Sequence, residues 1–216
     1  MPDLSRHTVL VTGASGRLGS VLVQSLLDGG ARVAALDRTA DAPDGALAIA
    51  ADVLDEAAVG DAFARAEAEL GTPTAVVHTV GTWDGAPLAE TDLDAWNRVL
   101  ALNLTSAFLV FREAARRLGP DGVIVGIASG QGADRAPAEQ AAYAASKAGV
   151  VRLVEATAAE AGAPHAVAVA PSTILFGDES ADAKGVSVGA VADLCVRLCA
   201  DGALHDGATL RIYGSA

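Results

Sequence analysis

Short runs of valine, isoleucine, leucine and alanine alternate along this chain with longer alanine-rich segments, and glycine, proline, aspartate or serine marks each change. The short runs predict buried strands. The longer segments repeat their apolar positions with the period of a helix. The expected strands lie near residues 7–12, 32–36, 47–51, 74–79, 122–128, 165–170 and 209–213, and the expected helices near 17–29, 55–70, 94–118, 139–162 and 188–200. This order of elements is typical of a βαβ protein.

Several expected strands are apolar at every position rather than at alternate positions, as in "VIVGIA" at 123–128 and "AVAVA" at 166–170. Parallel strands that are covered by helices on both faces have this pattern. The sequence therefore predicts an α/β fold with a doubly wound, mostly parallel, seven-stranded sheet in three α/β/α layers. Since no repeat, low-complexity segment or Pro/Ser-rich linker interrupts the pattern, we expect one domain over 1–216.

The expected helix at 94–118 is apolar around most of its circumference between Val99 and Phe111. A helix that only covered a sheet would show a polar stripe, so this one is expected to be buried by a second subunit. We predict a homo-oligomer, a dimer or a tetramer, that is formed through the 94–118 and 139–162 helices. The alternative is a monomer in which Asn103, Thr105 and Ser106 form a modest polar face.

Composition narrows the classes of partner. The net charge of −12 repels polyanions, which disfavours nucleic acid and anionic membranes. No run reaches the roughly 18 uncharged apolar residues of a membrane span. The N-terminus "MPDLSRH" lacks the basic segment that leads a secretory signal. A cytoplasmic location is therefore expected.

Cysteine and histidine give no sign of a metal site. Cys195 and Cys199 lie four residues apart in an expected helix, where core packing explains them better than a disulfide framework or zinc. The histidines have no ligand-like spacing; they are His7, His78, His165 and His205. We therefore predict that the chain has no resident metal.

The sequence "TGASGRLG" at 12–19 follows the first expected strand and opens the first expected helix. In open parallel sheets this turn takes the pyrophosphate of a dinucleotide. Gly13 would permit the tight exit from the strand, Gly16 would let the backbone approach phosphate, and Gly19 would allow close helix packing. With Ser15 and Leu18, these glycines place the free N–H groups of a helix N-terminus beside the anion.

The next expected strand ends at Asp37, where a carboxylate can accept hydrogen bonds from the adenosine ribose hydroxyls. Because a carboxylate repels a 2′-phosphate, Asp37 favours NAD. Arg17 and Arg38 favour the alternative, NADP, since guanidinium can clamp a 2′-phosphate. Asp52 and Val53 follow the third strand and are candidates to read the adenine edge and stack on it. Ordinary turn or loop roles are the alternative for Asp37 and Asp52.

Tyr143 and Lys147 lie four residues apart at the start of an expected helix, so both face one site. A nearby ammonium is expected to lower the pKa of the tyrosine, which makes it a general acid and base. Ser129 follows the fifth strand at the same edge of the sheet and can hydrogen-bond a carbonyl or alcohol oxygen.

These pieces in this order resemble the short-chain dehydrogenase/reductase family over essentially the whole chain. The matching motifs are "TGASGRLG", "ADV" at 51–53, "LNL" around Asn103, Ser129 and "YAASK" at 143–147. The resemblance implies a Rossmann-like fold and an NAD(P)-dependent oxidoreductase acting on a small carbonyl or alcohol. Tyr143 would transfer the proton and Ser129 would orient the substrate oxygen. Lys147 would hold the nicotinamide ribose while lowering the pKa of Tyr143, and Asn103 would anchor a water-linked proton relay. Tyr143 and Lys147 would both contact the cofactor. The cofactor would also contact Gly81 and, after the sixth strand, Pro171, Ser172 and Thr173.

Four features depart from the family pattern. "HTVG" at 78–81 replaces Asn-Asn-Ala-Gly, Pro171-Ser172 replaces Pro-Gly, the loop between Ser129 and Tyr143 is slightly longer, and the lid region 176–187 is abbreviated. We expect Trp83, Asp84 and Arg135 to line the mouth of the pocket. Two alternatives stay open: a dinucleotide-binding relative without turnover, and an isomerase or dehydratase that regenerates its cofactor in each cycle.

Overall fold

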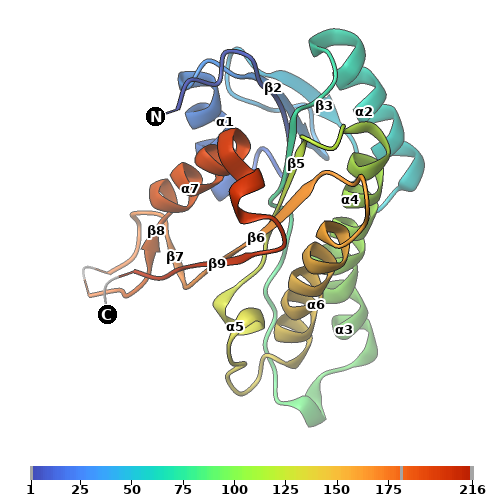
Figure 1. Ribbon diagram of the computed structural model, residues 1–216. Helices are drawn as coiled ribbons and strands as arrows, with labels where there is room; N and C mark the ends of the chain where they lie inside the picture. The colour runs from blue at the N-terminus through green and yellow to red at the C-terminus, as the bar shows by residue number, and fades with distance from the viewer. Residues whose placement is uncertain (1, 181, 215–216) are drawn as a thin grey trace.

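The computed structural model describes residues 2–180 and 182–214, and a parallel sheet runs through its middle (Figure 1). The sheet order is β3-β2-β1-β4-β5-β6-β9, and every adjacent pair is parallel. These strands are β1 (Thr8–Thr12), β2 (Arg32–Asp37), β3 (Leu47–Ala50), β4 (Ala75–His78), β5 (Val123–Ile127), β6 (His165–Pro171) and β9 (Thr209–Ile212). The predicted seven-stranded, doubly wound α/β sheet is confirmed.

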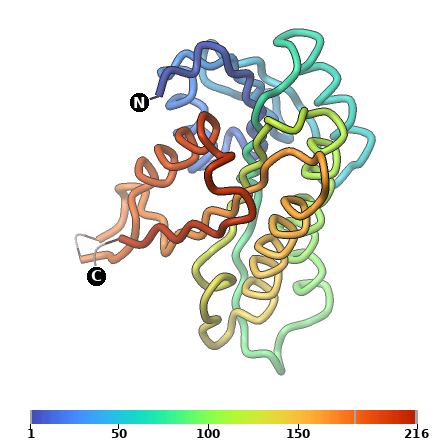
Figure 2. Tube along the Cα trace, in the orientation of Figure 1, coloured from blue at the N-terminus to red at the C-terminus, as the bar shows by residue number. Residues whose placement is uncertain are grey.

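The two faces of the sheet carry separate apolar cores because successive strand side chains point in opposite directions. In β1, Val9 and Val11 belong to one core and Leu10 belongs to the other. Figure 1 shows α1 (Arg17–Asp28) and α7 (Val188–Asp201) on one face. The other face is covered by α2 (Glu56–Leu70), α4 (Ser106–Arg117) and α6 (Ala141–Ala158). Figure 2 shows the trace of α7 beside that of α1, although the two are far apart in sequence.

The helix expected over 94–118 is divided into three parts, which corrects the prediction of one regular helix. It consists of α3 (Leu93–Leu100), a π-helical turn over Ala101–Thr105 and α4. A π turn inserts one extra residue into a helix, and such turns are frequent at functional sites. Asn103 lies in the middle of this turn and is fully buried.

The segment expected as a helix over 139–162 is helical only over α6. Glu139 has a φ of +64°, a conformation that no helix accommodates, so α6 begins after it. Five short elements of the described chain were not predicted: α5 (Gly130–Ala133), the parallel pair β7 (Ile174–Leu175) and β8 (Val186–Ser187), and the 3-10 helices η1 (Leu88–Glu90) and η3 (Gly202–His205). Within the described ranges, no helix is long and apolar enough to cross a membrane.

Candidate functional site

A cleft of about 890 Å³ opens beyond the carboxyl ends of β4, β5 and β6. This is the edge of a doubly wound sheet where ligands bind. The cleft is lined by three of the predicted catalytic side chains, Ser129, Tyr143 and Lys147. It is also lined by the predicted cofactor residues Leu18, Gly81, Pro171, Ser172 and Thr173.

Asn103 does not line the cleft, and its amide joins the loop after β4 to α6. Its Oδ1 accepts from the N–H of Thr82 at 2.7 Å, and its Nδ2 donates to the carbonyl of Thr82 and to Ser146 Oγ, both at 2.9 Å. The Ser146 hydroxyl in turn donates to the carbonyl of Tyr143 at 2.7 Å. Asn103 therefore connects the loop after β4 to the first turns of α6. Sequence reasoning missed Thr82 and Ser146; the polar Ser146 beside Lys147 was the available signal.

Lys147 is buried, and its Nζ donates to the carbonyl of Ile127 at 2.8 Å. Burial lowers its pKa from 10.5 to about 8. Its surroundings leave little room, because a Cβ on Gly81 would lie 3.1 Å from Lys147 Nζ and 3.0 Å from Asn103 Oδ1. A Cβ on Gly132 in α5 would lie 2.5 Å from the Lys147 backbone carbon. Glycine at these two positions is what lets Lys147 sit against β5.

Tyr143 lies in the first turn of α6, and Ser129 caps the N-terminus of α5 by accepting from the N–H of Gln131 at 3.2 Å. Burial raises the pKa of Tyr143, and a hydrogen bond with Ser129 opposes that rise only in part. The sequence-based expectation that Lys147 lowers the pKa of Tyr143 is therefore wrong for this structure. The physical reason is that Lys147 donates to Ile127, while desolvation acts directly on the phenol.

The glycine loop has the geometry of a tight strand-to-helix turn. Gly13 has a φ of +73°, and a Cβ on Gly19 would lie only 2.0 Å from the carbonyl oxygen of Gly13. Gly16 is the N-cap of α1 and supplies no side-chain hydrogen bond to the helix. The first N–H groups of α1 therefore have no side-chain acceptor at the N-cap.

Asp37 is the last residue of β2 and lies beside this loop. Its Oδ2 accepts from the N–H of Ser15 at 3.0 Å and its Oδ1 from the N–H of Arg38 at 2.7 Å. Asp52 is exposed and accepts from the N–H of Leu54 at 2.9 Å, the ordinary loop role. The Val53 side chain is buried in the core, which does not support the predicted stacking of its side chain on adenine.

The Arg17 side chain contacts the abbreviated lid. Its Nη2 lies 2.6 Å from Asp178 Oδ1, and its guanidinium lies 3.9 Å from the centre of the Phe176 ring. Phe176 also lines the cleft. Local sequence patterns could not predict this pairing, because Asp178 is separated from Arg17 by 161 positions.

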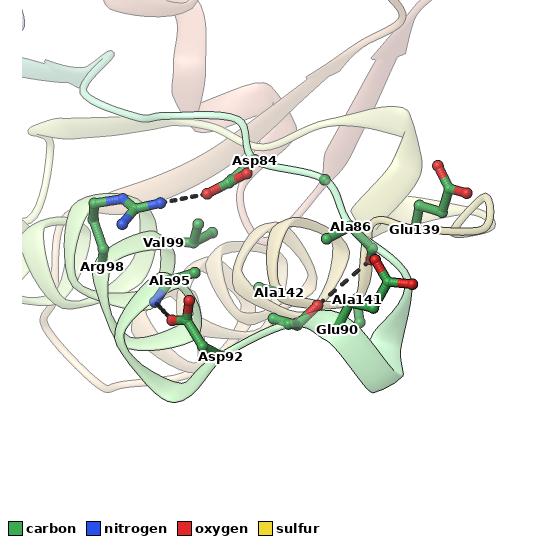
Figure 3. Close-up of a pocket in the computed structure, with 12 residues that line it drawn as sticks. Asp84, Ala86, Glu90, Asp92, Ala95, Arg98, Val99, Glu139, Ala141 and Ala142 are labelled. Atoms are coloured by element: carbon green, nitrogen blue, oxygen red, sulfur yellow. Dashed lines mark hydrogen bonds and ion pairs between the residues drawn. The ribbon is translucent and has the colours of Figure 1, made fainter.

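The three residues expected at the mouth of the cleft divide between two cavities. Trp83, which is 60% exposed, and Arg135 line the cleft, as the sequence predicts. Asp84 does not; it pairs with Arg98 in a neighbouring pocket of about 280 Å³ between α3 and the start of α6 (Figure 3). No predicted catalytic residue lines this smaller pocket, so the larger cleft is the better candidate site.

Comparisons with known proteins agree with this geometry. A family model described as short chain dehydrogenase matches residues 7–176. The chain is a member of the short-chain dehydrogenase/reductase family. A D-threitol dehydrogenase of Mycolicibacterium smegmatis is 34% identical over 172 residues, which cover 74% of this chain and 66% of the relative, just under two thirds. The 3-oxoacyl-[acyl-carrier-protein] reductase MabA of Mycobacterium bovis is 33% identical, with 80% of this chain and 71% of the relative covered.

Solved structures resemble this family member over almost its entire length. The crystal structure of a dehydrogenase/reductase from Sinorhizobium meliloti 1021 matches with a TM-score of 0.87 and 27% identity, covering 97% of this chain and 94% of that one. The short-chain dehydrogenase/reductase family is a family of enzymes that use NAD(P).

The residues of this short-chain dehydrogenase/reductase fit such a dinucleotide. The uncapped N-terminus of α1 suits a pyrophosphate, and the Asp37 carboxylate at the end of β2 suits ribose hydroxyls. The close packing of Gly19 on Gly13 keeps the loop tight. Two side chains of the predicted cofactor set have other contacts: Arg17 pairs with Asp178, and Val53 is buried in the core.

The two cysteines of this family member lie on the buried face of α7. Cys195 and Cys199 are both free and buried, and burial raises the pKa of both thiols, that of Cys195 to about 12. In the part of the chain that the structure describes, no cluster of three His, Cys, Asp or Glu residues is placed to hold a metal ion. Core packing therefore accounts for the cysteines.

His78 starts the departure of this family member from Asn-Asn-Ala-Gly, and the structure gives it a structural role that sequence reasoning missed. Its Nδ1 lies 2.8 Å from Thr12 Oγ1, and its Nε2 lies 3.1 Å from Ser106 Oγ. Because Ser106 donates its own hydrogen to the carbonyl of Leu102, it accepts from Nε2, and Thr12 donates to Nδ1. Neutral His78 thus ties β1 to the start of α4.

Burial and, secondarily, the charge of Lys147 lower the pKa of His78 from 6.5 to about 3. Below pH 6.5 His78 binds a proton in the unfolded chain but stays neutral in the folded chain. His78 therefore destabilises the fold increasingly as the pH falls toward 3. Between about pH 7 and about pH 5, wild type should lose about 2 kcal/mol more unfolding free energy than His78→Asn. Urea titrations at the two pH values measure this difference. Equal losses in the two proteins would contradict the assignment.

Proposed function

We propose that this chain is an NAD(P)-dependent oxidoreductase that interconverts a carbonyl and an alcohol on a small molecule, with residues 1–216 acting as one domain. The observation that carries the proposal is the shared cleft. Ser129, Tyr143 and Lys147 line one cavity together with Leu18 at the start of α1 and the residues after β6. A hydroxyl, a phenol and an ammonium group in one cavity are the groups that carbonyl reduction needs.

Tyr143 is proposed to transfer the proton. Because burial raises its pKa, Tyr143 keeps its proton at neutral pH, and it can donate that proton to a carbonyl oxygen. Ser129 would donate to the same oxygen and hold it in place. Alcohol oxidation needs the phenolate instead, so we expect the rate of reduction to be higher near neutral pH and the rate of oxidation to rise at higher pH.

Lys147 and Asn103 are proposed to support Tyr143. With a pKa of about 8, Lys147 is mostly charged at neutral pH, and its ammonium would hold the nicotinamide ribose. Asn103 fixes the position of α6 through Ser146, and it is proposed to anchor a water-linked proton relay. A bound nicotinamide dinucleotide supplies the hydride, which no side chain can supply.

NAD is the proposed cofactor, and Asp37 carries the preference. Asp37→Asn keeps an oxygen for the N–H of Ser15 but removes the charge that repels a 2′-phosphate. The ratio of NADPH affinity to NADH affinity should therefore rise about tenfold, which is about 1.4 kcal/mol. Fluorescence titration with both dinucleotides measures it, and Asp52→Asn serves as the control because that exposed carboxylate also follows a strand. An unchanged ratio in Asp37→Asn would show that the preference lies elsewhere.

The direct test is turnover. Purified protein with NADH or NADPH, and separately with NAD or NADP, is offered a panel of small carbonyls and alcohols while nicotinamide absorbance is followed. The proposal expects net oxidation or reduction of the dinucleotide with some members. Tight dinucleotide binding without turnover would favour the non-catalytic relative, and product without net change in absorbance would favour an isomerase or dehydratase.

Homo-oligomerisation through α4 and α6 is also proposed. Phe108 on α4 is 44% exposed, and the guanidinium of Arg112 lies over the Phe108 ring, 5.1 Å from the ring centre. An exposed aromatic on a largely apolar helix is typical of a surface that meets another protein. Light scattering of the purified chain gives the mass of the assembly directly.

A further inference from the structure

The abbreviated lid has an internal structure of its own. The Glu179 carboxylate accepts from the N–H of Phe176 at 2.9 and 3.0 Å and from the N–H of Gly177 at 2.9 Å. Gly177 has a φ of +92°, which allows the sharp turn. The segment 176–179 is thus a compact turn whose shape does not depend on Arg17.

This turn contacts the rest of the protein through Arg17. The flat guanidinium lies on the Phe176 ring at 3.9 Å, and the same group pairs with Asp178 at 2.6 Å. One side chain therefore contacts two residues of the turn by two different interactions. The bond to Arg17 also lowers the pKa of the Asp178 carboxyl, which keeps it charged.

The contact spans the glycine-loop end of the cleft. Leu18, the neighbour of Arg17 in α1, lines the cleft, and Phe176 lines it as well. At its base the lid is held by the pairing of β7 with β8. The N–H of Val186 donates to the carbonyl of Thr173 at 2.9 Å there. Arg17 therefore fastens the free side of a short flap to the loop that would hold the pyrophosphate.

We infer that Arg17 is a positioning residue: with Phe176 and Asp178 it forms a latch that holds the lid over the glycine loop and slows the release of a bound dinucleotide. The inference rests on the proposed function, since it needs a dinucleotide in the cleft. It also assigns Arg17 a role other than clamping a 2′-phosphate, because its charge is directed to Asp178. The Arg17 and Asp178 side chains are each more than half exposed, so their ion pair is modest in strength and can open in each turnover.

The test is the dissociation rate of NADH, or of NADPH if wild type binds it more tightly, measured by stopped-flow fluorescence with an excess of unlabelled competitor. Arg17→Ala removes both contacts and should speed dissociation about tenfold, whereas Asp178→Ala removes only the ion pair and should speed it about threefold. Arg17→Lys should be intermediate, because it keeps the charge for Asp178 and loses the flat contact with Phe176. Arg65→Ala is the matched control, since Arg65 makes a similarly exposed ion pair with Glu69 on α2, 2.8 Å long.

The variants separate the latch from its rivals. If Arg17→Ala speeds dissociation but Asp178→Ala does not, Arg17 acts on phosphate directly and the latch is wrong. If every variant, including Arg65→Ala, speeds dissociation in proportion to a fall in Tm, the faster release comes from general destabilisation of the fold. That result would also contradict the latch. If wild type binds neither dinucleotide, the proposed function itself fails and the latch fails with it.

Discussion

Replacing Tyr143 with phenylalanine should lower kcat/KM by roughly 10²–10⁴-fold, because it removes the proposed proton donor. The affinity for dinucleotide should hardly change, since the phenyl ring still fills the same place on α6. In wild type, the rate of carbonyl reduction should be flat near neutral pH and fall at high pH as the phenol ionises. The rate of alcohol oxidation should rise over the same interval. Steady-state kinetics in both directions over a pH series measure these expectations.

Tyr213 offers a matched control for this substitution. It is the other tyrosine of the chain, it lines the same cleft, and its hydroxyl bonds to Asp134 rather than to Ser129. Tyr213→Phe should therefore change kcat/KM only slightly. Equal activity of wild type and Tyr143→Phe would remove Tyr143 from the chemistry, whatever Tyr213→Phe did.

Replacing Gly19 with alanine should greatly weaken dinucleotide binding and lower the stability of the fold. The added Cβ would lie 2.0 Å from the Gly13 carbonyl oxygen and 2.9 Å from Ala14 Cα, and both are backbone atoms that cannot rotate away. The glycine loop must then separate from α1, at a cost of about 1–3 kcal/mol or more. We expect an affinity loss of at least about 100-fold by fluorescence titration, because the loop and the helix N-terminus must both face the pyrophosphate.

Gly189→Ala is the control for Gly19→Ala. Gly189 lies in the first turn of α7, as Gly19 does in α1, and a Cβ there meets no atom within 4 Å. This substitution should leave binding unchanged and, since alanine favours helix, raise stability by about 0.5–1 kcal/mol. Dinucleotide affinity that survived in Gly19→Ala would show that the loop does not hold the pyrophosphate.

The sequence predicted the sheet because fully apolar strands and alternating helices leave a strong periodic signal. The same signal could not show the π turn at Asn103, since one extra residue barely disturbs a helical pattern over a dozen positions. Strands of two residues, such as β7 and β8, are too short to have a period at all.

The candidate site was predictable where residues act through local spacing, as Tyr143 and Lys147 do. It was not predictable where the effect depends on solvation or on distant partners. Spacing suggested that Lys147 lowers the pKa of Tyr143, whereas burial raises it. No local sequence pattern could predict that Arg17 pairs with Asp178, because the two are far apart in sequence. The same holds for His78 with Thr12 and Ser106.

The central claim is that a nicotinamide bound in this cleft exchanges hydride with a substrate while Tyr143 handles the proton. The most direct measurement uses reduced dinucleotide that carries deuterium at the transferable position, with a carbonyl that wild type consumes, and mass spectrometry of the alcohol. The account predicts one deuterium on the carbinol carbon of the product, and none there when the label is only in the solvent. Product without label from the dinucleotide, or no consumption of dinucleotide with any carbonyl or alcohol, would contradict it.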